Sequence, residues 1–414
     1  MKLTSNTIFT YIIMAFLIKL SAFCAYWDTL PKGVRTLVYR QVFVRGLEGS
    51  FDDKNQYDAY KLNLKLDSHT LHEINSATKM VFDELNRISP EAYEQFSFGE
   101  FKGEANADIN ASVIGLGLGV SDRMSAYFYV PYYNADVNID FKRTVGNNHR
   151  QVVDSIENSP VRDDVSTLFA GIMNNLWDVN EGTLQSVVVN NFGYNPVGDW
   201  HAKGWGDLEL GLMYRLTNWT DAGLLVAGGL VAPTGREDDP DSLHDIPFGD
   251  GQWDVFFEFG GGRRFNRLYG VDSWIRYTYQ APYKREIRLP ESSSFPLTAR
   301  KGEARIKRGN KIDWNLKGNI YCRDWFTVSP YYIFQLKTED SYESEYSDAD
   351  AILSEDSNLI AHSAGLTFTF STIGFFKRKK FPLPMDIAVG ALSIFAGKNT
   401  ERYNRYDLEA RFYF

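Results

Sequence analysis

The chain has 414 residues, a formal net charge of −9 and 15% aromatic residues, of which 24 are Tyr, 29 are Phe and 9 are Trp. Its length allows one large barrel or two to three soluble domains. The mean hydropathy of −0.32 excludes a membrane protein built from many apolar helices, and the acidic balance argues against nucleic acid as a partner.

Residues 1–25 are predicted to form a secretory signal peptide. Lys2 precedes an apolar run from about Ile8 to Leu20, and small residues follow it. A retained membrane anchor is the alternative. Cleavage after Cys24 would leave only Cys322, so the mature chain could form no internal disulfide.

The next part of the chain combines one strand with two long insertions. Residues 34–45 are strand-like, and residues 47–104 are predicted to form a long loop with local structure. Within that loop, residues 57–66 alternate well enough to be a barrel strand instead, and residues 76–88 have helical spacing. Residues 140–203 are predicted to form a second insertion, polar and partly helical.

From residue 107 the chain shows repeated segments in which apolar and polar residues alternate, the pattern of half-buried strands. These predicted strands cover residues 107–120, 124–134, 208–216, 224–230, 253–264, 271–280, 312–320, 326–334, 360–370, 387–395 and 406–414. Together with residues 34–45 they make about 12 strands, an even number that brings both chain ends to one side. Connections alternate between short turns and long polar loops, as in outer-membrane barrels.

The last strand combines an apolar face with a charged one. The apolar face consists of Tyr406, Leu408, Ala410, Phe412 and Phe414. The opposite face carries Arg405, Asp407, Glu409 and Arg411. A strand of this kind that ends on Phe resembles the C-terminal assembly signal of bacterial outer-membrane barrels, which the barrel assembly machinery reads.

These patterns predict an all-β fold, a transmembrane antiparallel up-and-down β-barrel of about 12 strands with two long, partly helical loop insertions. The barrel would occupy residues 26–414 and lie in the bacterial outer membrane. Outer-membrane lipids, lipopolysaccharide and the barrel assembly machinery are the expected partners, together with a small-molecule solute.

Three motifs between residues 204 and 280 resemble the family of phenol-degradation meta-pathway transporters, which are outer-membrane β-barrels. A Gly-Asp strand start is followed by a Pro-Thr-Gly strand end and a Gly-x-Gly-x-x-Asp return. The motif residues are Gly206, Asp207, Pro233, Thr234, Gly235, Gly249, Gly251 and Asp254. The resemblance implies a channel for small, often aromatic or hydrophobic, compounds. From the residues alone, Pro233-Thr234-Gly235 is a strand-to-loop corner, with a ligand contact as the alternative.

The alternation also predicts which charged residues line the lumen. The candidates for solute transport are Asp207, Glu209, Arg215, Asp254, Glu258, Arg276, Asp313, Lys317, Glu409 and Arg411. Both signs are present, so these residues either filter solutes or form a salt-bridged structural interior. A barrel of this size is narrower than the porins of about 16–18 strands.

The sequence predicts no enzyme, catalytic residue, cofactor or metal site. His69 and His72 have weak zinc spacing without a third ligand nearby, and the acidic residues 238–245 lack the ladder of a calcium loop. The predicted function is passive transport of small solutes, with hydrophobic or aromatic compounds as candidates. A surface-binding or structural barrel with a plugged lumen is the second hypothesis. A loop-based barrel enzyme that uses His201 or His244 is the third.

Overall fold

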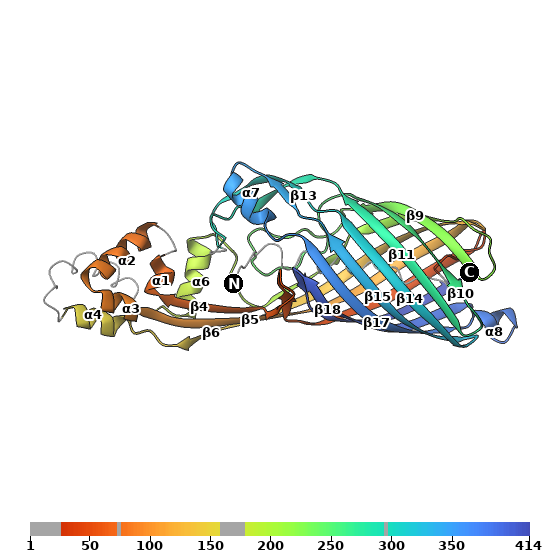
Figure 1. Ribbon diagram of the computed structural model, residues 1–414, viewed down its shortest axis with the longest axis horizontal. Helices are drawn as coiled ribbons and strands as arrows, with labels where there is room; N and C mark the ends of the chain where they lie inside the picture. Colours follow the sequence, from red (N-terminus) through yellow and green to blue (C-terminus); the bar gives the residue numbers. More distant parts are fainter. Residues whose placement is uncertain (1–25, 73–75, 158–178, 294–296) are drawn as a thin grey trace. The chain divides into compact units, whose positions relative to one another are not determined.

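The computed structural model describes residues 26–72, 76–157, 179–293 and 297–414 (Figure 1). The predicted signal peptide and its membrane-anchor alternative fall on residues 1–25, outside the described residues. Within the described ranges, no helix is both long and apolar enough to cross a membrane.

Twelve antiparallel strands of the described chain close into a barrel, as predicted. Each strand pairs with the next one along the chain. They are β1 (Arg35–Leu47), β5 (Ser97–Ser121), β6 (Met124–Val145), β8 (Leu208–Arg215), β9 (Ala222–Ala232), β10 (Asp254–Arg264), β11 (Tyr269–Gln280), β14 (Lys311–Arg323), β15 (Phe326–Lys337), β17 (Leu359–Ser371), β18 (Met385–Lys398) and β20 (Asn404–Tyr413).

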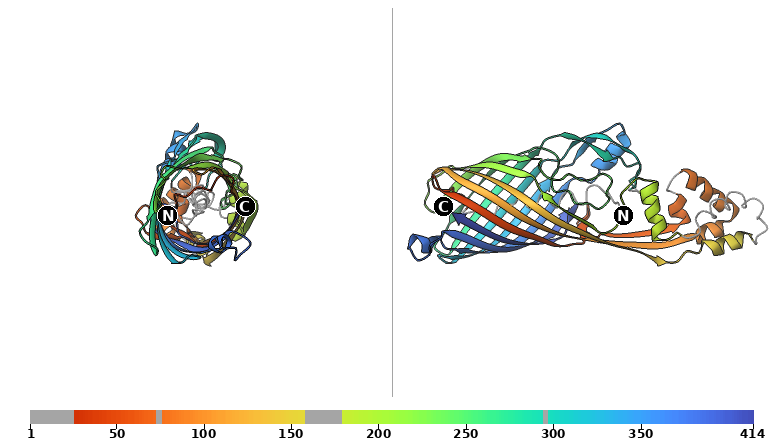
Figure 2. Two further views of the ribbon diagram at one scale, coloured as in Figure 1. Left: turned by 90° about the vertical axis from the view of Figure 1, so that its right-hand side faces the viewer. Right: turned by 180° about the vertical axis from the view of Figure 1, so that it is seen from behind.

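The first and last strands seal the barrel. β1 pairs with β20 from Thr36 opposite Tyr413 to Arg45 opposite Asn404, and its other edge pairs with β5. The view along the barrel shows the resulting ring of strands (Figure 2, left). Closure gives every barrel strand two neighbours and so removes the unpaired edges of an open sheet.

Side chains alternate between the two faces of the wall because the side-chain period of a strand is two. On the outside, Leu212 and Phe257 are more than half exposed, at 54% and 55%, whereas the inward-facing Glu258 is 1% exposed. Trp314 and Leu316 also point outward. The apolar side chains therefore coat the outer surface, and the charged ones are enclosed.

Connections at one end of the barrel are short, as predicted. β5 and β6 are separated by two residues, and β14 and β15 by two as well. The longest connection at this end joins β17 to β18 and contains α8 (Ile373–Lys377), which Figure 1 shows beside the C-terminus. Five of the six connections at the other end are longer and carry most of the additional structure, while residues 399–403 join β18 to β20 directly.

Small sheets and one helix decorate the long connections of the barrel unit. They are β7 (Trp200–Trp205), which pairs with β6; the sheet of β2 (Gly49–Phe51), β3 (Tyr57–Ala59) and β19 (Thr400–Glu401); the sheet of β12 (Tyr283–Arg288), β13 (Lys301–Lys307) and β16 (Ser341–Glu343); and α7 (Ser347–Ser354).

The described residues of 60–105 and 138–198 form a second compact unit, which includes residues 97–105 of β5 and 138–145 of β6. Its other described elements are β4 (Lys61–Asp67), α1 (Ser68–His72), α2 (Ser76–Ile88), α3 (Pro90–Gln95), α4 (His149–Glu157) and α6 (Glu181–Asn190). Phe82, Phe96 and Phe101 are buried in its core. β4 pairs only with the outer part of β5, so the alternating residues 57–66 add no strand to the closed ring.

Removal of one carboxylate at the seam is expected to destabilise the barrel. Asp407 accepts hydrogen bonds from Nε of Arg40 (3.0 Å) and of Arg405 (3.1 Å), and all three residues are buried. Asp407→Ala leaves two buried guanidinium groups without this partner. It should lower the free energy of unfolding, measured by urea titration in detergent, by about 3–5 kcal/mol.

A matched control is Glu303→Ala, which removes an exposed partner of Lys284. Exposed ion pairs contribute about 1 kcal/mol or less. Equal effects of the two substitutions would contradict a stabilising role for the buried cluster.

Candidate functional site in the barrel lumen

Most of the predicted lumen-lining residues lie on the inner wall. The buried ones are Glu209, Asp254, Glu258, Lys317, Glu409 and Arg411, while Arg276 and Asp313 are partly buried. Arg215 lies at the short-turn end, where its Nη1 donates to Asp28 Oδ1 at 3.3 Å. Asp207 precedes β8 at the opposite rim. The register thus places the candidates, while their part in transport stays a prediction.

A charged cluster occupies the middle of the inner wall. The Arg276 guanidinium donates to Glu209 at 2.9 Å and to Glu258 at 3.3 Å, and it stacks 3.7 Å above the Phe256 ring. Tyr127 donates its hydroxyl to Glu209 at 2.9 Å. Within this cluster one guanidinium is shared by two carboxylates.

The segment before β1 lies inside the barrel. Tyr26 stacks on Trp274 with ring centroids 4.5 Å apart and donates its hydroxyl to Glu258 at 3.1 Å. Trp27 is 4% exposed and packs where a side chain at Gly223 or Gly262 would collide with it. The alternation pattern did not predict this segment, although the aromatic pair Tyr26-Trp27 directly follows the predicted signal peptide. The lumen is therefore partly filled from the short-turn end.

The family-motif residues interlock at the opposite rim. Asp207 accepts backbone hydrogen bonds from Gly235 (2.9 Å) and Asp250 (3.1 Å). Thr234 Oγ1 donates to the Gly206 carbonyl and accepts from the Leu208 N–H, each at 3.0 Å.

The remaining motif glycines allow neighbouring segments to approach the backbone closely or allow the chain to turn. A side chain at Gly206, Gly235 or Gly249 would collide with neighbouring atoms, and Gly251 has φ +72°. Pro233-Thr234-Gly235 forms a strand-to-loop corner, and Asp254 begins β10.

This corner directs the β9–β10 loop, residues 233–253, toward the inner wall instead of outward. Phe248 is fully buried and stacks on Tyr133 of β6 with ring centroids 5.2 Å apart. His244 is buried as well, and burial lowers its pKa. His244 therefore lies in a connecting loop, as the third hypothesis requires, but its side chain is enclosed there.

Arginines pair with two acidic residues of this loop. Asp245 pairs with Arg236 at 2.7 Å, and Asp241 pairs with Arg288 at 2.5 Å. Burial, and then the neighbouring Asp245, raise the pKa of Asp238 to about 8. In the described ranges, no group of three or more His, Cys, Asp or Glu residues is arranged to hold a metal ion.

The histidines proposed for an enzyme have different surroundings. His201 is exposed on β7 and contacts Asp136 Oδ1 at 2.6 Å, whereas His244 is enclosed by its loop. His69 and His72 contact Glu94 and Asp83 in the second unit.

Two neighbouring cavities lie between the loops and the wall. The first, of about 80 Å³, is bounded by Tyr133, Phe248, Asp250 and the charged residues of β10, β11 and β14. The second, of about 50 Å³, reaches Glu401 and shares Lys311, Asp313 and Gln335 with the first.

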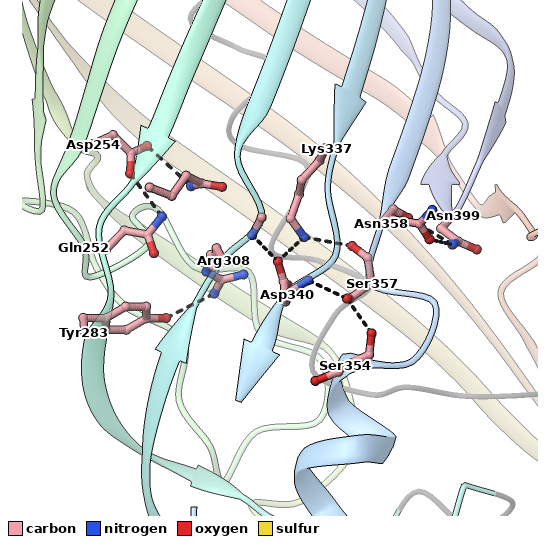
Figure 3. A network of polar contacts seen from close by, with 12 residues as sticks. Gln252, Asp254, Tyr283, Arg308, Lys337, Asp340, Ser354, Ser357, Asn358 and Asn399 are labelled. Atoms are coloured by element: carbon pink, nitrogen blue, oxygen red, sulfur yellow. Dashed lines mark hydrogen bonds and ion pairs between the residues drawn. The ribbon is translucent and has the colours of Figure 1, made fainter. Parts of the chain in front are cut away.

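A polar network supports this end of the barrel (Figure 3). Lys337 Nζ pairs with Asp340 at 2.6 Å and donates to the Ser357 carbonyl at 2.9 Å. Beside it, Gln252 Nε2 donates to Asp254 at 3.1 Å. These contacts hold the side chains at this end of the barrel in place.

No protein-family model matches the chain, and no curated protein matches it in sequence. Among solved structures, an outer membrane channel from Pseudomonas putida F1 is similar over 94% of this chain and 98% of its own, with 12% identity and a TM-score of 0.51. Identity at this level establishes a shared fold.

Two weaker similarities have TM-scores too low to carry an argument. The Ralstonia pickettii toluene transporter TbuX has 8% identity and a TM-score of 0.33, over 93% of this chain and 90% of that one. A Pseudomonas aeruginosa FadL homologue has 10% identity and a TM-score of 0.33, over 99% and 95%.

Loss of the Asp207 carboxylate should loosen the β9–β10 loop. Asp207→Ala removes the acceptor of two backbone hydrogen bonds, and each bond contributes about 0.5–1.5 kcal/mol. Trypsin should then cut after Arg236 at least about tenfold faster. Asp221→Ala, in an exposed short turn, is the control. An unchanged cleavage rate in Asp207→Ala would show that other contacts hold the loop.

Glu401 should make stability depend on pH. Burial raises its pKa to about 8, from an ordinary value of 4.5. The protonated side chain is therefore favoured in the folded state, so stability is full below about pH 4.5 and falls as the pH rises to about 8, by at most about 1.4 kcal/mol per pH unit. Glu401→Gln should flatten the decline in unfolding free energy between pH 5 and 8. The exposed Glu343→Gln should leave that decline unchanged.

Proposed function

We propose that the protein is a passive channel of the bacterial outer membrane through which small solutes cross. One observation carries this proposal: a closed barrel has an apolar outer face and a charged interior that contains two neighbouring cavities. A surface of this kind is stable in lipid, and the polar interior gives solutes a path that avoids the hydrocarbon.

The outer surface supports the proposed partners. Its apolar strands would contact outer-membrane lipids and, on the long-loop side, lipopolysaccharide. At the chain end, Phe414 is 64% exposed, and Tyr406 and Leu408 face outward beside it. An accessible aromatic strand suits recognition by the barrel assembly machinery.

We also propose membership of the phenol-degradation meta-pathway transporter family, on the basis of the motifs that interlock at Asp207. The aromatic walls formed by Tyr133 and Phe248 would suit an aromatic or hydrophobic solute. The charges favour a polar one: the first cavity is bordered by five carboxylates and by only two cationic side chains. A channel with this balance should prefer cations to anions.

The second hypothesis is a surface-binding barrel with a plugged lumen. It is favoured by the position of Tyr26 and Trp27 inside the wall. We propose no catalytic role, since His201 and His244 have separate surroundings.

Planar-bilayer recordings distinguish the two hypotheses. The wild-type protein should give small, cation-preferring conductance steps in a KCl gradient. Trp27→Ala should enlarge the steps, because it removes a ring from the lumen. Trp219→Ala, on an exposed turn, is the control and should leave them unchanged. Absence of conductance in the wild type and in Trp27→Ala would sink the channel and favour the plugged barrel.

A further inference from the structure

The first cavity is bordered by two charged groups of opposite sign, each with a buried atom that has no hydrogen-bond partner in the described ranges. Asp250 is 5% exposed, and its Oδ2 has no hydrogen-bond partner among the residues that the structure describes. Lys311 Nζ, at the start of β14, is likewise buried without one in the described ranges. Both side chains border the same cavity.

The other charges around this cavity are engaged. Glu258 contacts Arg276 and Tyr26. Asp254 accepts from Gln252, and Asp313 accepts from Gln335 Nε2 at 2.9 Å. Asp250 and Lys311 thus stand out as the charges that remain available to a solute.

A buried charged atom without a hydrogen-bond partner costs about 1–3 kcal/mol or more. Asp250 and Lys311 could lower that cost by pairing, yet in the described structure no ion pair joins them. A molecule between them that carries both charges would satisfy each one: its ammonium group would meet the carboxylate, and its carboxylate would meet the ammonium group.

The rest of the cavity limits what that molecule can be. Tyr133 and Phe248 stack to form one wall, and Trp274 borders the cavity as well. These rings suit a short apolar side chain or an aliphatic backbone. The volume of about 80 Å³ restricts the occupant to a small molecule.

We propose that this cavity is a transit site for small zwitterions of the α-amino-acid type. The carboxylate of the solute faces Lys311, and its ammonium group faces Asp250. The proposal rests on the proposed channel function and specifies its solute class. The excess of carboxylates around the cavity draws the ammonium end in first, and Lys311 supplies the single complementary contact for the other end.

Uptake into proteoliposomes tests the site with two isomers. Alanine is zwitterionic, whereas lactamide has the same atoms and no charge. At low concentration, wild-type protein should take up labelled alanine faster than lactamide, and alanine uptake should saturate. Asp250→Asn and Lys311→Gln should each reduce alanine uptake by about tenfold and leave lactamide uptake unchanged.

The controls make the same chemical changes outside the lumen. Glu303→Gln and Lys284→Gln alter an exposed ion pair and should change neither rate. The shift of folded barrel on unheated gels verifies that each variant is folded. If a variant does not fold, the charge-conserving variant Asp250→Glu or Lys311→Arg is measured in its place. It should take up alanine faster than lactamide.

Three outcomes would overturn the site. Equal uptake of both isomers by all folded variants would show that the cavity does not recognise charge. A fall in alanine uptake with Asp250→Asn and a rise with Lys311→Gln would indicate a cation path instead. In either of these cases, continued uptake of lactamide would still support the proposed channel function. Absence of uptake of both isomers would refute that function.

Discussion

The structure depends on the closure of one sheet into a ring, because closure separates the two faces of every strand. On the outside no charge can be hydrated, so the outward positions carry Leu, Phe, Trp and Ile. On the inside, the lumen is too narrow to keep all the inward-facing charged side chains in bulk water. The same alternation that makes the outside apolar therefore fills the inside with charged side chains.

These enclosed charges determine most of the inner architecture. Arg276 joins Glu209 and Glu258, and Asp407 joins Arg40 and Arg405. At the loop end, Asp207 accepts hydrogen bonds from two backbone N–H groups of the β9–β10 loop. These bonds hold the loop toward the inner wall. The side chains around the cavities are thus held in place, which for the proposed channel would favour discrimination by charge.

The sequence allowed the barrel, its strand number and the inward-facing set to be predicted. Ile312, Trp314 and Leu316 alternate with Lys311 and Asp313 strongly enough to define the register, and a strand has only two faces. Positions set by long-range packing were harder to predict. Tyr26 reaches Glu258 across 232 residues, and no local periodicity reports such a contact. His244 has the polar neighbours of an outside loop, yet Phe248 anchors that loop on Tyr133.

The pairing of β1 with β20 has a consequence for biogenesis. Arg40 and Asp407 stand 367 residues apart, so the seam cannot form until synthesis has reached the far end of the polypeptide. Before that moment the nascent sheet has two open edges, each able to add a strand from another molecule. A chain truncated before Asn404 would keep both edges and tend to aggregate.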